Sequence, residues 1–147
     1  MVLSAMALVA FPVSLQQAQK PVEKESVAEF KIPPEAVKQV NPVKPTLESV
    51  ARGKRMYGFD CAMCHGKAGD GKGDVAADMH VNLRDYRDPS SLKDMTDGEL
   101  SYIITKGKGE MTGEEGRVKP EEVWNMVNYL RSLAQKETPP KSKRQSP

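Results

Sequence analysis

Residues 61 to 65 read Cys-Ala-Met-Cys-His, and this pentapeptide constrains the fold more strongly than any other feature of the sequence. A C-x-x-C-H run is the attachment signature of a c-type haem. Thiols at this spacing can reach the two vinyl groups on one edge of a porphyrin, and the histidine that follows can ligate the iron from below the ring. The chain has two cysteines and two histidines, so the motif uses both thiols and one imidazole. We therefore expect one covalent haem c, attached through Cys61 and Cys64 and ligated by His65.

Three other chemistries could use the same residues. A thioredoxin-like dithiol belongs near a strand–helix–strand pattern, and no β-branched run precedes Cys61. A structural zinc site needs four ligands, usually as two closely spaced pairs, whereas His80 stands alone in the sequence. A disulfide between residues so close together would close a very short loop and constrain little of the chain. The motif therefore favours haem attachment, with these three chemistries as alternatives.

The composition is that of one small domain. The chain has 147 residues, of which 5% are aromatic and 29% are charged. So few aromatic residues make a thin core, which a buried haem would enlarge with a large apolar body of its own. The formal net charge is only +2, which gives no reason to expect a nucleic-acid partner.

The N-terminal residues 1–19 are expected to be a signal peptide or an N-terminal anchor. Residues 1–15 are rich in Val, Leu, Ala, Met and Phe, like the apolar region of a signal peptide. This region lacks a preceding Lys or Arg, ends without a small-x-small cleavage pattern, and is short for a full membrane span. Haem is joined to C-x-x-C-H thiols outside the bacterial cytoplasm. We therefore expect an exported, periplasmic protein, with membrane association through this segment as an option.

Proline and charge mark the boundaries of the compact domain. Residues 20–45 carry alternating charges and few large apolar side chains, which predicts a Pro-rich linker that is extended and partly disordered. Residues 138–147 form a basic tail in which two adjacent prolines oppose a helix. The domain itself then spans residues 46–137. The linker prolines are Pro21, Pro33, Pro34, Pro42 and Pro45.

The first part of the domain is predicted to be a helix followed by a loop. Thr46 can cap this helix, with Glu48 in its first turn. Gly53 lies inside the helix, where glycine costs about 1 kcal/mol against alanine, so it is either tolerated sequence noise or the site of a close helix crossing. The stretch from Gly66 to Gly73 is glycine-rich and predicts a loop. It resembles a phosphate cradle superficially, but no G-K-[S/T] ending follows.

Two further helices have clear boundaries in the sequence, so the fold class is predicted to be all-α. Thr96 and Glu99 form a capping box for a helix that runs to about Lys106, and Gly107 stops it. The last helix starts at Pro120, a residue suited to the first helical position. Its apolar residues recur at helical spacing and predict a buried face, with Trp124 and Tyr129 elsewhere on the helix. The residues of that face are Val123, Val127, Leu130 and Ala134.

A second axial ligand must come from a distant part of the chain, and methionine, histidine or no protein ligand are the main options. Met111 lies in a polar, glycine-rich loop between Lys106 and Gly113, where glycines let the backbone follow a flat ligand closely. We expect Met111 to be this ligand. The alternatives are His80, Met79, or a Met111 that covers the haem without ligating the iron. The remaining methionines occupy positions that suit other roles: Met1 and Met6 lie in the export segment, Met63 inside the motif, Met56 and Met126 within helices, and Met95 at staple spacing from Leu100.

With these motifs in place, residues 46–133 resemble the class I c-type cytochromes, and look most like single-haem domains similar to the haem c subunit of cbb3-type oxidases. The pentapeptide is highly specific, whereas the other segments are weak singly but occur in the family's order. The segments are Gly53–Tyr57, Cys61–Gly66, Gly69–Gly71, Ile104–Gly107 and Tyr129–Arg131.

The resemblance implies a small cytochrome c-like helical domain wrapped around one haem. It implies thioethers at Cys61 and Cys64, and axial ligation by His65 and Met111. It also implies that the first and last helices cross with Gly53 facing Tyr129. The sequence departs from the family pattern at two places where proline is common, which are occupied here by Thr112 and His80.

The leading functional prediction is an electron carrier, not an enzyme, whose iron cycles between Fe(III) and Fe(II) in an exported electron-transfer chain. Its partners would be a protein electron donor and a protein acceptor. One alternative is a haem enzyme with an open distal site. Another is a relay module that docks to a larger oxidoreductase, which the proline-rich linker would suit. No acid–base pair or substrate pocket is evident in the sequence.

Overall fold

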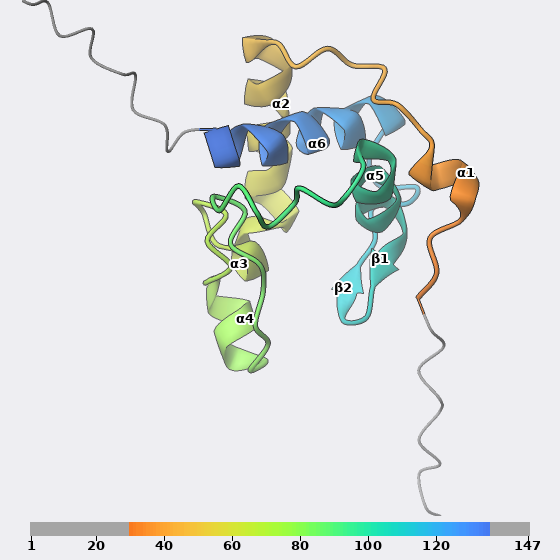
Figure 1. Ribbon diagram of the computed structural model, residues 1–147. Helices are drawn as coiled ribbons and strands as arrows, with labels where there is room; N and C mark the ends of the chain where they lie inside the picture. The colour runs from red at the N-terminus through yellow and green to blue at the C-terminus, as the bar shows by residue number, and fades with distance from the viewer. Residues whose placement is uncertain (1–29, 136–147) are drawn as a thin grey trace, which may run out of the picture.

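The computed structural model describes residues 30–135, and in this part of the chain the fold is all-α apart from one short hairpin (Figure 1). The predicted signal peptide or anchor (residues 1–19) and the basic tail (residues 138–147) lie outside the described residues. None of the helices within residues 30–135 is long and apolar enough to cross a membrane. The elements are α1 (Pro34–Val37), α2 (Leu47–Asp60), α3 (Ala62–His65), α4 (Asp74–Asp78), α5 (Asp97–Lys106), β1 (Gly107–Lys108), β2 (Met111–Thr112) and α6 (Pro120–Gln135).

Helices α2 and α6 cross each other at the centre of the molecule (Figure 1). A Cβ on Gly53 would overlap the backbone carbonyl of Asn125 and lie only 2.9 Å from the Cβ of Tyr129. Glycine is therefore required here because the two backbones approach too closely for a side chain. The crossing is closed by Tyr57 and Tyr129, whose rings meet edge to face with centroids 5.2 Å apart. The sequence prediction of a close crossing at Gly53 is confirmed.

The core forms where α6 meets α2 on one side and α5 on another. Val123, Val127 and Leu130 are buried as predicted, while Ala134 is only half-buried. Tyr129 is also buried, although the apolar period placed it off the buried face. The reason is that two helices cover α6, so its buried surface is wider than one stripe. The core residues are Tyr57, Leu92, Leu100, Ile104, Val123, Met126, Val127, Tyr129, Leu130 and Leu133.

The predicted helix boundaries are confirmed by their hydrogen bonds. The hydroxyl of Thr46 accepts from the Ser49 amide at the start of α2. At the start of α5, the Thr96 hydroxyl accepts from the Glu99 amide while the Glu99 carboxylate accepts from the Thr96 amide. Each such cap is worth about 1 kcal/mol. Gly107, with φ of 81°, ends α5 in a conformation that favours glycine.

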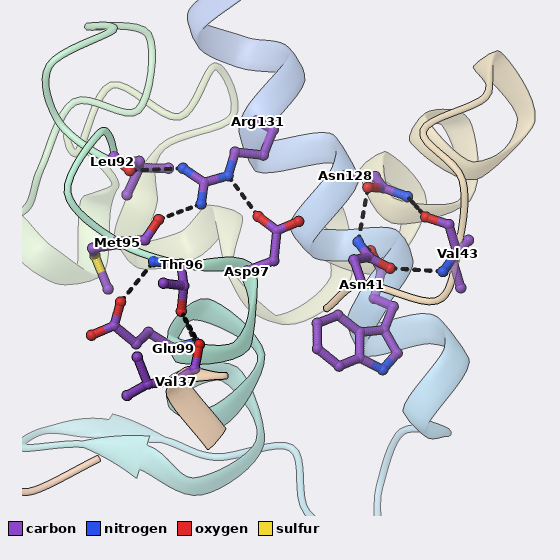
Figure 2. A network of polar contacts seen from close by, with 11 residues as sticks. Val37, Asn41, Val43, Leu92, Met95, Thr96, Asp97, Glu99, Asn128 and Arg131 are labelled. Atoms are coloured by element: carbon purple, nitrogen blue, oxygen red, sulfur yellow. Dashed lines mark hydrogen bonds and ion pairs between the residues drawn. The ribbon is translucent and has the colours of Figure 1, made fainter. Parts of the chain in front are cut away.

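Residues 30–45, which we call the N-terminal arm, differ from the sequence prediction. They were expected to be an extended linker, but they contain α1 and pack along α5 and α6 (Figure 1). Asn41 donates from Nδ2 to the side-chain oxygen of Asn128, at 2.9 Å, and to the backbone oxygen of Trp124. Asn128 in turn donates to the Val43 carbonyl (Figure 2). Residues 30–45 thus differ from an extended linker in containing the helical turn α1 and in being held to α6 by part-buried hydrogen bonds.

Arg131 of α6 ties the segment before α5 to the helical core. Its guanidinium donates to the Asp97 carboxylate at 2.9 Å and to the Leu92 carbonyl at 2.7 Å. It also donates to the Met95 carbonyl (Figure 2). One side chain thus satisfies two backbone carbonyls and one carboxylate, and so fixes where α5 starts relative to α6.

Candidate functional site

The C-x-x-C-H motif forms one helical turn. The amides of Cys64 and His65 both donate to the Cys61 carbonyl, at 3.2 Å and 2.9 Å. Residues three and four apart on a helix lie on the same face, so this turn brings both thiols and the imidazole to one side of α3. The two cysteines are free and half-buried. The structure therefore brings together the three motif residues that the sequence singled out.

The alternative chemistries find little support in the described residues. Burial raises the pKa of the Cys61 thiol to about 12, with a further contribution from the Glu114 carboxylate. A reactive redox thiol needs the opposite shift, because the thiolate is the nucleophile. Residues 30–135 contain no group of three or more His, Cys, Asp and Glu side chains that could hold a metal ion. A zinc site therefore has no second pair of ligands in this part of the chain.

The glycine-rich loop predicted after the motif folds back onto it. The amide of Gly71 donates to the His65 carbonyl at 2.8 Å, and that of Gly73 donates to the Cys64 carbonyl at 3.0 Å. A Cβ on Gly73 would lie 2.6 Å from the Cys64 carbonyl oxygen, so only glycine fits there. Gly66 has a φ of 79° and begins this turn. The glycines thus let the loop pack closely against α3. This packing accounts for them without a bound phosphate.

His65 is held between this loop and an aromatic ring that the sequence pattern did not identify. Tyr86 stacks on the imidazole, with ring centroids 5.1 Å apart and planes 26° apart. Burial lowers the pKa of His65, and its buried Nδ1 atom has no hydrogen-bond partner among residues 30–135. A neutral imidazole keeps a ring lone pair for a metal ion. The donor set of two thiols and a neutral imidazole on one turn therefore fits an iron porphyrin bound through its vinyl groups.

Two tyrosines hold the framework around His65. The hydroxyl of Tyr57, on α2, donates to the Gly66 carbonyl at 2.8 Å in a buried position. The amide of Tyr86 donates to the Gly69 carbonyl at 2.7 Å. Tyr57 was among the residues that carry the family resemblance. Tyr86 gave only a weak signal, a single aromatic residue in an otherwise polar stretch, because its contact with His65 depends on how the loop folds.

Met111 lies in a two-stranded hairpin rather than in an irregular loop. Strands β1 and β2 are antiparallel, with Lys108 opposite Met111 and Gly107 opposite Thr112. The Met111 side chain is half-buried. In Figure 1 this hairpin extends from the end of α5, and α3 lies elsewhere, below α2. The elements that carry His65 and Met111 are therefore separate parts of the fold.

The competing ligands lie in a different environment. His80 is exposed and has a φ of 54°, unusual for a residue other than glycine, just after α4. Met79 beside it is 44% exposed. Met126 is buried in the core and Met56 packs against the core cluster. Met95 is half-buried, and its sulfur accepts from Arg84 at 3.6 Å. The assignment of Met111 as the second ligand stays a prediction.

A buried carboxylate lies between the hairpin and α6. Glu114 is only 6% exposed; burial raises its pKa, Arg117 opposes this shift, and Asp60 adds to it. Arg117 lies 3.6 Å from the Glu114 carboxylate and 3.2 Å from that of Asp60 at the end of α2. The chain that follows the hairpin is thus tied to the helix that precedes Cys61.

Comparison with known proteins places this geometry in context. The family model for cytochrome c matches residues 50–134. The cbb3-type cytochrome c oxidase subunit FixP of Bradyrhizobium sp. (strain ORS 278) is 32% identical over 91 residues, which are 57% of this chain and 30% of that protein. The chain therefore spans less than two thirds of the length of this curated relative. A solved chain of the Kuenenia stuttgartiensis reducing HAO-like protein complex has a TM-score of 0.56 and 23% identity, over 64% of this chain and 47% of its own. That structure shows a similar fold.

Proposed function

This chain belongs to the cytochrome c family and carries one covalent haem c, and from that premise we propose that it is an electron carrier of an exported electron-transfer chain. The bound haem supplies one-electron chemistry, its iron alternating between Fe(III) and Fe(II). The protein supplies attachment, axial ligands and burial, which together set the potential.

The observation that carries this proposal is the single helical turn of α3. Cys61 and Cys64 are the attachment residues, because the turn brings two unpaired thiols to the same side as His65. His65 is the proximal ligand, kept neutral by burial and held in orientation by the ring of Tyr86. The backbone of this turn is restrained as well, since the amides of Gly71 and Gly73 donate to the carbonyls of His65 and Cys64.

Met111 is the proposed distal ligand. The antiparallel pairing with β1 fixes its backbone, and the half-buried side chain carries a soft thioether that supports ferrous iron. His80 remains the rival ligand, on an exposed turn. With both axial positions filled by protein atoms, small molecules would be excluded from the iron, which is why we propose a carrier rather than a haem enzyme.

Two measurements test the proposal together. Acid–acetone extraction of the purified holoprotein should leave the haem on the polypeptide, and Cys61→Ala or Cys64→Ala should weaken or abolish its attachment. The oxidised holoprotein should show the weak far-red absorption band of sulfur-to-iron charge transfer. Haem that leaves on extraction would refute the attachment site, whereas a covalent haem without the far-red band would refute methionine ligation alone.

A second candidate function is that of a relay module within a larger oxidoreductase. The observation that favours it is the 32% identity to a protein named as an oxidase subunit. Purification from membranes and from the periplasmic fraction separates the two. A carrier should be recovered in the periplasmic fraction and accept electrons from a soluble donor, whereas a relay should co-purify with an oxidase.

A further inference from the structure

The first described residue of the N-terminal arm touches the hairpin that carries Met111. The ring of Phe30 lies against Tyr102 of α5, with centroids 6.1 Å apart and a tilt of 54°. The Lys108 ammonium lies 5.5 Å from the centre of the Phe30 ring. Phe30 thus contacts both the helix that precedes the hairpin and the first strand of the hairpin itself.

Lys108 is the residue directly opposite Met111 in the hairpin. Each strand is only two residues long. A shift of β1 at Lys108 therefore also moves β2 at Met111. A two-stranded hairpin is marginally stable by itself. Its geometry therefore depends on contacts from outside, and the side chain opposite Met111 receives one from Phe30.

The rest of the N-terminal arm is held to α5 and α6, so the chain that leads to Phe30 has a defined position. A Cβ on Gly98 would overlap the Ala36 carbonyl and lie 3.0 Å from the Gln39 carbonyl oxygen, so α1 rests directly on the start of α5. The Thr96 hydroxyl donates to the Val37 carbonyl at 2.9 Å (Figure 2). The arm is held at both α5 and α6, and Phe30 lies beyond these anchor points.

We propose that the N-terminal arm clamps the Met111 hairpin, and that Phe30 is a positioning residue for the Met111 thioether. The proposal rests on Met111 being the distal ligand. Loss of the Phe30 contact frees Lys108 and lets the hairpin sample positions in which the thioether does not reach the iron. The arm would therefore control how readily an external ligand replaces Met111, without contacting the haem.

The test is the affinity of the oxidised holoprotein for imidazole, which competes with a methionine ligand, together with the intensity of the far-red band. Phe30→Ala should raise imidazole affinity roughly tenfold, in line with the loss of one ring pair and one cation–ring contact. Phe30→Tyr keeps the ring and should leave the affinity at the wild-type value. Val40→Ala is the matched control, because Val40 lies on the same arm and is 84% exposed.

Three further variants test whether the effect is local. Gly98→Ala should raise imidazole affinity as Phe30→Ala does, because its Cβ pushes α1 off α5 while alanine itself favours the helix. Val127→Ala, at a core position that is 0% exposed, should lower the unfolding temperature without changing imidazole affinity. The effects of Phe30→Ala and Lys108→Gln on imidazole affinity should be less than additive in the double variant, because both substitutions break the same contact.

The outcomes separate this inference from the proposed function. If Met111→Ala removes the far-red band but Phe30→Ala and Gly98→Ala leave both the band and the imidazole affinity unchanged, the clamp is refuted and the ligand assignment stands. An equal rise in imidazole affinity for Val127→Ala also refutes the clamp, because global destabilisation would then account for it. If Met111→Ala leaves the band unchanged, the ligand assignment is wrong and the clamp inference fails with it.

Discussion

Tyr86 lies flat against the imidazole of His65, with ring centroids 5.1 Å apart and ring planes only 26° apart. His65 belongs to α3, whereas Tyr86 lies in a loop without regular secondary structure, so no local sequence pattern pairs the two residues. Stacking limits rotation of the imidazole and removes it from water. The orientation of His65, the proposed proximal ligand, is therefore restrained by a residue outside the C-x-x-C-H motif.

Tyr86→Ala should disturb the proximal side of the haem. Removing the half-buried ring should lower the free energy of unfolding by about 2 kcal/mol and should free the imidazole to rotate. Paramagnetic shifts of the haem methyl groups in the oxidised protein report that rotation. Tyr86→Phe keeps the stacked ring and is the control. Methyl shifts identical to wild type in Tyr86→Ala would show that the stacking does not orient His65.

Tyr57→Phe should destabilise the protein although it removes a single oxygen atom. The Tyr57 hydroxyl is a buried donor to the Gly66 carbonyl, which also accepts from the Gly69 amide, so the variant loses one buried hydrogen bond, worth about 0.5–1.5 kcal/mol. Chemical denaturation of the two holoproteins measures this difference. Tyr102→Phe, at a half-exposed position on α5, should be close to neutral. A Tyr57→Phe protein as stable as wild type would mean that the hydrogen bond from the Gly69 amide is enough for this carbonyl.

Gly53→Ala and Gly58→Ala should have opposite effects although both lie in α2. A Cβ on Gly53 would overlap α6, and overpacking of this kind costs about 1–3 kcal/mol. A Cβ on Gly58 meets no atom of the described residues within 4 Å, so alanine there should stabilise the helix by about 1 kcal/mol. Thermal unfolding of the two variants gives both signs at once. Stabilisation by Gly53→Ala would contradict the close crossing of α2 and α6.

The pH dependence of stability should contain a contribution from Glu114. Burial raises its pKa in the folded protein, so the folded state holds the proton to higher pH than the unfolded state. Below about pH 4.3, the ordinary glutamate pKa, Glu114 is protonated in both states and does not change the free energy of unfolding. As pH rises from there through the raised pKa of the folded state, ionisation of Glu114 lowers the free energy of unfolding. Glu114→Gln cannot ionise and should be the more stable protein above this window.

Denaturation of wild type and Glu114→Gln across this pH range measures the difference. The two curves should coincide in shape below the window and separate within it. If wild type gains stability relative to Glu114→Gln as pH rises, the attraction of Arg117 outweighs burial and the direction of the shift is wrong.

Met111→Ala should open the sixth position of the iron. The midpoint potential should fall, by a fraction of the roughly 0.8 V that axial ligands span, because the thioether favours Fe(II). Carbon monoxide should bind the reduced variant readily and the wild type poorly. His80→Ala is the matched control and should leave the haem spectrum unchanged. The reverse pattern would identify His80 as the ligand and the protein as a bis-histidine cytochrome.

The sequence alone determined the features that depend on neighbouring residues. The Thr46 cap, the Thr96–Glu99 capping box and the stop at Gly107 were all predictable, because each is a hydrogen bond or a backbone conformation within one turn. The haem chemistry was predictable for the same reason, since the two thiols and His65 lie on one helical turn. Gly53 left two interpretations open, tolerated sequence noise or a close helix crossing, and the family resemblance favoured the crossing that the structure shows.

Tertiary structure alone decided the contacts between distant residues. Asn41 and Asn128 lie 87 residues apart and no local pattern pairs them, so the sequence of the proline-rich arm by itself predicts an extended linker. The stacking of Tyr86 on His65, the burial of Tyr129 and the contact of Phe30 with Lys108 are of the same kind. Local sequence encodes where each helix begins and ends and which of its faces is apolar. Which side chains from distant segments come into contact depends on how the helices pack.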